Sequence, residues 1–297
     1  MKFFFAIISS LVISLSAVAS QWLYYKHYPW VYDNASEDWL YLRGAENGTI
    51  YAYSHSTKEW EEFTAIKDDD VIPIPIPTWE QQYEEWIQNP EPYGGLSVLQ
   101  QIKGAKDRGD TSIDLMGKNI SDISPLAGLT NLTSLVLFDN NISDLSPLEG
   151  LSDLTTLDLF YNNISDIYPL EGLINLTELS LTLTNISDIS PLAELTNLTT
   201  LKVYNSNIFE LSPLAKLKNL TNLQLGRNSI SDLTPLAGLL NLTELELHGN
   251  NISDLSPLEG LSNLTSLSLY ENNISASQKS MLEEALPLPN TVIYWQL

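Results

Sequence analysis

The chain carries a hydrophobic pattern that repeats every 22 residues between residues 110 and 275. Positions 4 and 6 of each copy are apolar and have mostly polar neighbours, which is the two-residue period of a half-buried strand. Position 11 is always Ile, and positions 14, 17 and 20 are Ile or Leu in the complete copies. One copy cannot bury so many apolar side chains alone, so we expect the copies to stack as turns of a solenoid. The eight turns, of which the last is incomplete, begin at Asp110, Leu132, Leu154, Leu176, Leu198, Leu220, Leu242 and Leu264.

The spacing of the apolar positions also predicts the fold class. It matches the leucine-rich pattern L-x-x-L-x-L-x-x-N-x-L. We therefore expect an α/β solenoid, a leucine-rich-repeat horseshoe with a parallel sheet on its concave side. Most turns then carry Ser-Pro-Leu or Thr-Pro-Leu, which predicts a hydroxyl cap followed by proline in the first helical position. Few residues remain before the next strand, so the convex side should be 3₁₀-helical or irregular.

Two repeat positions carry the same type of polar residue in most turns, and these residues form columns when the turns stack. Position 9 is asparagine in five turns: Asn140, Asn162, Asn228, Asn250 and Asn272. Because an amide both donates and accepts, stacked asparagines are expected to bond backbone groups where the chain leaves the strand. Position 13 is acidic in seven turns: Asp122, Asp144, Asp166, Asp188, Glu210, Asp232 and Asp254. These carboxylates are expected to form turns with their own backbone, and calcium binding is the alternative.

The repeated phrase N-I-S-D-I/L-S-P-L-x-x-L-x-N-L-T resembles the 22-residue repeats of bacterial internalins and related secreted leucine-rich-repeat proteins. The resemblance covers residues 110–275 and is specific for the fold, because the shared residues are those of the core. For function it implies a binding role of the concave sheet, whose partner would be chosen by the variable residues.

Residues 1–19 have the character of a secretory signal. Lys2 precedes an apolar run from Phe3 to about Leu15, and Ala17-Val18-Ala19 forms a cleavage site. We expect a secreted, periplasmic or cell-surface protein whose mature chain begins at Ser20, and retention of the segment as an anchor is the alternative. No later segment is apolar enough to cross a bilayer. The chain has no cysteine, so a disulfide framework, a thiol nucleophile and a lipid-modified cysteine are excluded.

Residues 20–67 are rich in Trp and Tyr at alternate positions, which predicts a β-hairpin module of three or four short antiparallel strands. Flat aromatic faces suit sugar rings, but they equally supply the apolar area of a small sheet, and both interpretations stay open. The candidate sugar-binding residues are Trp30, Tyr32, Trp39, Tyr41 and Trp60. The Asp- and Pro-rich residues 68–77 predict an extended linker.

Both ends of the repeat array are expected to be covered, because the terminal turns would otherwise expose their leucines. Residues 78–109 are predicted to form a helical N-terminal cap, and residues 276–297 a C-terminal cap of one helix and one strand. The expected elements are helices at residues 78–88, 96–106 and 277–286 and a strand at residues 291–295.

The net charge and the sequence motifs indicate a binding function and no catalytic one. The formal net charge is −23, and residues 110–275 hold 5 basic and 20 acidic residues, so we expect no nucleic acid partner. The three histidines are scattered, and the chain has no H-E-x-x-H, no G-x-S-x-G and no phosphate-binding glycine loop. We therefore expect no enzymatic activity, no cofactor and no metal.

The candidate binding surface is the exposed face of the predicted parallel sheet, formed by positions 3, 5, 7 and 8. Position 7 is rich in aromatic residues, which are enriched at the centres of protein interfaces. The candidate partner-binding residues are Phe138, Phe160, Tyr161, Lys202, Tyr204, Arg227, His248 and Tyr270. The sequence thus predicts that this face binds a protein partner. The alternative is carbohydrate or cell-envelope binding through the N-terminal aromatic hairpins, with the solenoid as a scaffold.

Overall fold

The computed structural model describes the backbone of residues 30–33, 38–44, 50–54 and 60–63, and backbone and side chains of residues 77–286 and 291–296. The chain divides into two compact units, Met1–Thr78 and Trp79–Leu297. The predicted signal at residues 1–19 and nearly all of the predicted linker lie outside the described residues. Among the described helices, none is long and apolar enough to span a membrane.

The first unit contains a four-stranded antiparallel sheet in the order β1-β2-β3-β4, which confirms the predicted antiparallel arrangement. The strands are β1 (Trp30–Asp33), β2 (Asp38–Gly44), β3 (Ile50–Ser54) and β4 (Trp60–Phe63). The register places Trp30 opposite Tyr41, Tyr41 opposite Tyr53, and Tyr53 opposite Trp60. Four aromatic residues therefore form one row across the whole sheet.

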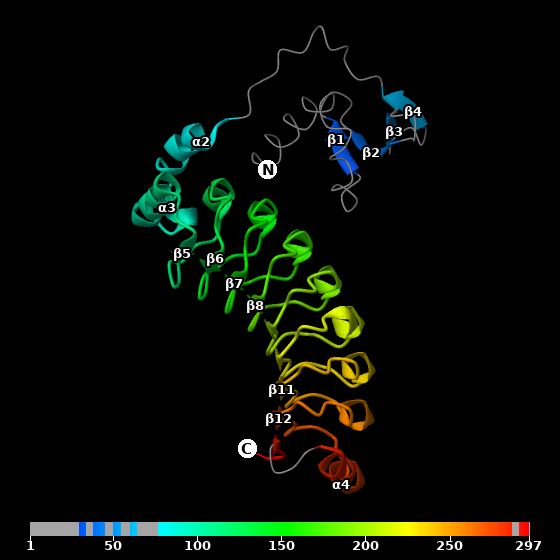
Figure 1. The fold of residues 1–297 in the computed structure, drawn as a ribbon. Coiled ribbons are helices and arrows are strands. Elements are labelled where there is room, and N and C mark those ends of the chain that lie inside the picture. The colour runs from blue at the N-terminus through cyan, green and yellow to red at the C-terminus, as the bar shows by residue number, and fades with distance from the viewer. Residues whose placement is uncertain are drawn as a thin grey trace. The chain divides into compact units, whose positions relative to one another are not determined.

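The second unit is the predicted solenoid. Its turns stack side by side, with the strands on the concave side and short helical turns on the convex side (Figure 1). Nine parallel strands form one sheet, in which each strand pairs with the next along the chain. The strands are β5 (Ser112–Asp114), β6 (Ser134–Val136), β7 (Thr156–Asp158), β8 (Glu178–Ser180), β9 (Thr200–Lys202), β10 (Asn222–Gln224), β11 (Glu244–Glu246), β12 (Ser266–Ser268) and β13 (Val292–Tyr294).

The strand register follows the sequence period. Ser112 pairs with Ser134, and Leu157 pairs with Leu179, which are 22 residues apart. The apolar positions of every turn consequently fall on top of one another and form one continuous core from Val98 to Leu286. The ninth strand, β13, comes from the C-terminal segment and extends the same sheet beyond the last repeat.

The convex side is 3₁₀-helical, as predicted. The segments are η4 (Ser124–Gly128), η5 (Ser146–Leu148), η6 (Tyr168–Leu170), η7 (Ser190–Leu192), η8 (Ser212–Lys216), η9 (Thr234–Leu236) and η10 (Ser256–Leu258). The predicted hydroxyl caps are wrong, however, because the serine or threonine is the first residue of its segment and no side-chain cap is formed.

The acidic residue at position 13 takes the capping role instead. The carboxylate of Asp122 accepts the N–H of Ser124 at 2.8 Å, and the same bond recurs from Asp144 to Ser146 at 2.9 Å. The hydroxyl and the backbone N–H of Thr234 likewise lower the pKa of the Asp232 carboxyl. These bonds confirm the turn-forming role of the acidic column. In the described part of the chain, no three His, Asp or Glu side chains converge as a metal site.

Three ladders of side chains hold successive turns together. The buried Asn140 accepts the N–H of Ile120 at 2.9 Å and donates to the carbonyls of Leu115 and Leu137, both at 2.9 Å, which confirms the predicted asparagine column. At position 2, threonine hydroxyls donate to the threonine carbonyl of the preceding turn, as Thr155 does to Thr133 at 3.0 Å. At position 22, a second series of asparagines donates to carbonyls of the preceding turn, as Asn175 does to Ser152 at 3.0 Å.

Both ends of the core are covered. Helix α2 (Trp79–Trp86) and helix α3 (Leu96–Arg108) lie at the N-terminal end, and the indole N–H of Trp79 donates to the carbonyl of Pro125 at 2.9 Å. A short 3₁₀ segment, η3 (Glu91–Tyr93), connects the two helices. Helix α4 (Ala276–Ala285) and strand β13 cover the C-terminal end.

Candidate functional site

The backbone turns sharply at position 8, just after each strand. All eight turns have a positive φ there, between 52° and 67°. The N–H of each position-8 residue except the last bonds the position-7 carbonyl of the next turn, as Tyr161 does to Thr182 at 2.9 Å. This bond holds the left-handed conformation, which turns the chain inward so that position 9 enters the core. Gly, Asn or Asp suits such a position, whereas other L-residues lose about 1–2 kcal/mol there.

Half of the residues at position 8 nevertheless have large side chains. Glycine occupies it at Gly117 and Gly249, asparagine at Asn205 and aspartate at Asp139. The other residues are Tyr161, Leu183, Arg227 and Glu271. Residues in unfavourable backbone conformations cluster at functional sites, so these side chains are candidates for a role other than stability.

Three aromatic rings form what we call the aromatic strip: Phe138, Phe160 and Tyr161. The rings of Phe138 and Phe160 lie 4.7 Å apart between centroids, and Phe160 and Tyr161 lie 6.4 Å apart. The Phe rings are half-buried, and Tyr161 is 56% exposed. The carboxylate of Asp158 accepts the N–H of Phe160 at 3.0 Å and so fixes the backbone beneath that ring. The strip is a partly exposed apolar surface beside the sheet, with Tyr161 as its most exposed member.

A second aromatic group, the histidine stack, consists of Tyr204, His248 and Tyr270. The imidazole of His248 is stacked on Tyr270 at 4.4 Å between centroids, and Tyr204 lies 5.5 Å from it. A Cβ at Gly226 would lie 2.6 Å from the His248 ring, so the ring depends on this glycine for its space.

His248 is only 6% exposed, so the expectation that it lies on an exposed face is wrong. Its burial lowers its pKa; the nearby Arg227 acts in the same direction, while Glu246 and Glu271 oppose it. The ring is therefore neutral near pH 7, and it can contribute packing surface but little direct contact to a partner.

The two basic residues of this face are Lys202 and Arg227. Lys202 lies on β9 and is half-buried, and Arg227 is exposed at position 8. The four ion pairs found among the described residues involve neither of them. Both cations are therefore open to an acidic partner group on an otherwise strongly acidic chain.

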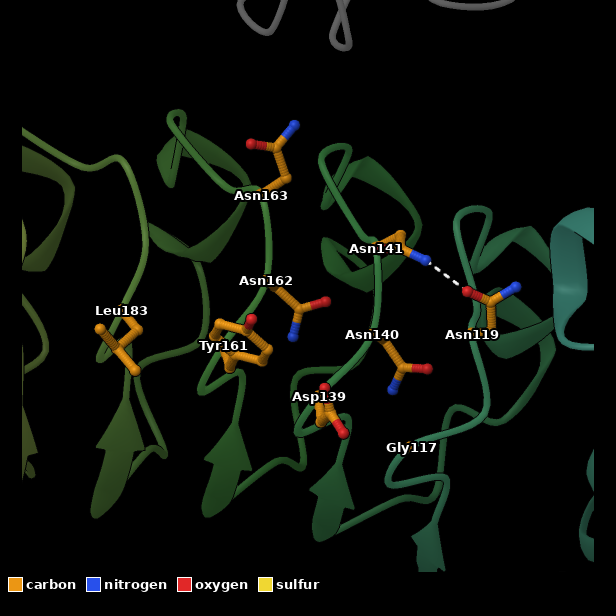
Figure 2. Close-up of a pocket in the computed structure, with 9 residues that line it drawn as sticks. All are labelled: Gly117, Asn119, Asp139, Asn140, Asn141, Tyr161, Asn162, Asn163 and Leu183. Atoms are coloured by element: carbon orange, nitrogen blue, oxygen red, sulfur yellow. Dashed lines mark hydrogen bonds between the residues drawn. The ribbon is translucent and has the colours of Figure 1, made fainter.

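A groove runs beside the sheet, where positions 8, 9 and 10 of successive turns follow one another. Figure 2 shows three rows: Gly117, Asp139, Tyr161 and Leu183 on one edge, Asn140 and Asn162 in the middle, and Asn119, Asn141 and Asn163 on the other edge. A second hollow shares Tyr161 and Leu183 and continues past Asn185 to Asn207. The hollows measure about 370 and 310 Å³, each within the range of ligand pockets. We call the two together the amide groove.

Comparison with known proteins identifies the family. A family model described as leucine-rich repeats (two copies) matches residues 111–150, 130–172, 152–194 and 240–280. The crystal structure of internalin C2 from Listeria monocytogenes is 33% identical in sequence, with a TM-score of 0.63, and the alignment covers 72% of this chain and 96% of that one. The chain belongs to the internalin family.

Other similar structures support the same fold for this internalin-family chain. The internalin InlF of Listeria monocytogenes is 34% identical, with a TM-score of 0.52 and coverage of 66% of each chain. A leucine-rich-repeat protein of Leptospira interrogans is 25% identical, with a TM-score of 0.54 and coverage of 62% of this chain and 54% of that one. No curated protein sequence matches significantly. Leucine-rich-repeat proteins of the internalin type typically mediate protein–protein interaction.

The structure of this internalin-family chain brings only some of the predicted site residues together. Phe138, Phe160 and Tyr161 are in contact, and the three members of the histidine stack form a separate group. The amide groove was not foreseen, although Asn-Asn-Ile at positions 9 to 11 of several turns is visible in the sequence.

Proposed function

We propose that the internalin-family solenoid binds a protein partner through its concave face, with the aromatic strip at the centre of the contact. The proposal assigns the chain no enzymatic role. The observation that carries it is the exposed ring of Tyr161, which lies beside Phe160 at a left-handed position.

Two features of the face support this assignment. Aromatic anchors on a rigid surface contribute most of the binding energy in protein interfaces, because they bury large apolar areas with little loss of side-chain entropy. The half-buried Lys202 and the exposed Arg227, two and three turns beyond Tyr161, would provide charged contacts farther along the same face. We expect a partner with an apolar centre and acidic groups at its edge.

Substitutions that the repeats themselves contain provide the test. Thr182 occupies position 7 and Asn205 position 8 in other turns, so Phe138→Thr, Phe160→Thr and Tyr161→Asn together should preserve the fold. Affinity for a partner recovered from surface extracts should fall by about 2 kcal/mol or more.

The matched control changes the convex side. Glu149, Glu171 and Glu259 are exposed at position 18, where four other turns carry alanine. Their joint replacement by Ala should leave affinity unchanged. If this triple abolishes binding and the aromatic triple does not, the concave-face proposal fails.

The first unit offers a second candidate function, carbohydrate or cell-envelope binding. The row of Trp30, Tyr41, Tyr53 and Trp60 across four strands favours it, because aromatic platforms suit sugar rings. Tyr32 lies opposite Trp39 in a neighbouring row. Replacing Trp30 and Trp60 by Leu should abolish glycan-array signals if this sheet is the platform, and unchanged signals would reject it.

We also propose that the chain is exported and that the mature protein begins at Ser20. The charged and apolar segments of residues 1–19 support this, as does membership of the internalin family. N-terminal sequencing of protein from the medium or cell surface tests it. Full-length chain in the membrane fraction would indicate a retained anchor instead.

A further inference from the structure

The amide groove has a regular row of polar groups along its outer edge. Position 10 is asparagine in the five turns that line it, and all five side chains are exposed: Asn119, Asn141, Asn163, Asn185 and Asn207. They differ from the buried asparagines at position 9, whose amides bond the backbone of neighbouring turns. The backbone bond that position 10 makes to the preceding turn does not require asparagine, because Ser229 makes the same bond.

These amides retain free hydrogen-bonding groups. Asn141 donates to Asn119 at 2.6 Å, and Asn185 donates to Asn163 at 2.9 Å (Figure 2 shows the first pair). Each pair keeps one Nδ2 that donates to no described residue and one Oδ1 that accepts from none. The groove therefore offers alternating donors and acceptors, with no charged lining residue other than Asp139.

The spacing of this row favours one class of ligand. Successive amides are one strand spacing apart, about 4.8 Å. An extended peptide along the groove would present equivalent backbone groups only every second residue, about 6.6–6.8 Å, and would lose register within two turns. A hexose unit of a linear glycan is close to one strand spacing in length, and each hydroxyl both donates and accepts.

The residues on the opposite edge of the groove also favour a linear glycan as the ligand. Tyr161 presents a largely exposed ring that can lie against a sugar face, and Asp139 adds a carboxylate acceptor for hydroxyls. The excess of acidic groups on the solenoid disfavours polyanionic chains. We propose that the amide groove binds an uncharged linear glycan, with one sugar unit per turn across turns one to five, at a site separate from the aromatic strip except for Tyr161.

The test uses the full chain and defined probes: linear tetrasaccharides of glucose, mannose and N-acetylglucosamine, and an uncharged hexapeptide of Ser, Thr and Gly. Calorimetric titration should give a dissociation constant of about 1 mM or tighter for at least one tetrasaccharide. Asn141→Ser, Asn163→Ser and Asn185→Ser together should weaken that binding about tenfold or more. Tyr161→Asn should weaken it as well.

The matched control is Asn251→Ser with Asn273→Ser, at the same repeat position outside the groove. It should bind like the unaltered chain, and circular dichroism should show all variants folded. The proposal is overturned if no tetrasaccharide binds, if only the peptide binds, or if the groove and control variants behave alike. The last result would indicate that the glycan binds at another site, for example at the aromatic row of the first unit.

Discussion

Replacing Asn162 by Ala tests how the turns are held together. The Asn162 amide accepts the N–H of Ile142 at 3.0 Å and donates to the carbonyls of Leu137 at 2.9 Å and Leu159 at 3.1 Å. The Leu137 carbonyl also accepts from Asn140, so alanine leaves two groups unpaired. Each unpaired buried group costs about 1–3 kcal/mol. Because the site is 7% exposed and admits little water, we expect a total loss of about 2–6 kcal/mol.

The residue at the same position of the next turn suggests a variant that should have intermediate stability. Thr184 occupies position 9 in the next turn, and its hydroxyl donates to the carbonyl of Leu181 at 2.7 Å, which is equivalent to the Leu159 carbonyl. Asn162→Thr should therefore restore one of the two lost bonds and cost about half as much as alanine. Thr156→Ala, on the exposed face of β7, should change stability by less than about 0.5 kcal/mol.

Equilibrium urea unfolding followed by circular dichroism provides the measurement, with an unchanged m value as the check that the same unit unfolds. The order of stability should be unaltered chain, Thr variant, Ala variant. Equal stability of the Thr and Ala variants, or a large loss in the Thr156 variant, would refute the assigned bonding pattern.

Three further predictions use the same assay. Gly128→Ala should destabilise the chain by about 1–3 kcal/mol, because its Cβ would lie 2.3 Å from the Trp79 ring. Gly150→Ala, at the same repeat position, has nothing within 4 Å of its Cβ and should be neutral. Equal effects would contradict the packing of Trp79 against the first turn. Leu183→Asn should stabilise by about 1 kcal/mol and Asn205→Leu should destabilise similarly, and the opposite signs would reject left-handed strain. Burial lowers the pKa of His248, so the unfolded chain binds more protons than the folded chain below about pH 6.5. Between about pH 7.5 and 5.5 the unaltered chain should therefore lose more stability than the His248→Gln variant. Equal losses would show that the ring is not buried.

The repeat architecture could be predicted because its causes are local and periodic. The two-residue alternation at positions 4 and 6, and the match of the position-9 amide to backbone groups, depend only on residue type and spacing. The same residues decide that the chain belongs to the internalin family. The sequence alone predicts the cap of the 3₁₀ segments at the wrong residue, because Asp122 and Ser124 both can form turns. The backbone of Ile123 between them, with φ of −105° and ψ of 15°, brings the carboxylate to the N–H.

The site was harder to predict because it depends on neighbouring turns. Tyr161 and Leu183 are not residue types that favour a positive φ, so their sequence positions gave no sign of the left-handed turn that opens the groove. The burial of His248 depends on the absence of a side chain at Gly226, 22 residues earlier. Such effects follow from the stacking of specific turns and not from the consensus of the repeat.

Hydroxyl-radical footprinting of the chain with and without its protein partner tests the proposed binding face most directly. The solenoid supplies its own controls, because Tyr168 is 41% exposed and Phe209 is 63% exposed outside the concave face. We predict that Phe138, Phe160 and Tyr161 become protected while Tyr168 and Phe209 react as before. Protection of Tyr168 or Phe209 with unchanged reactivity of the aromatic strip would contradict binding through the concave face.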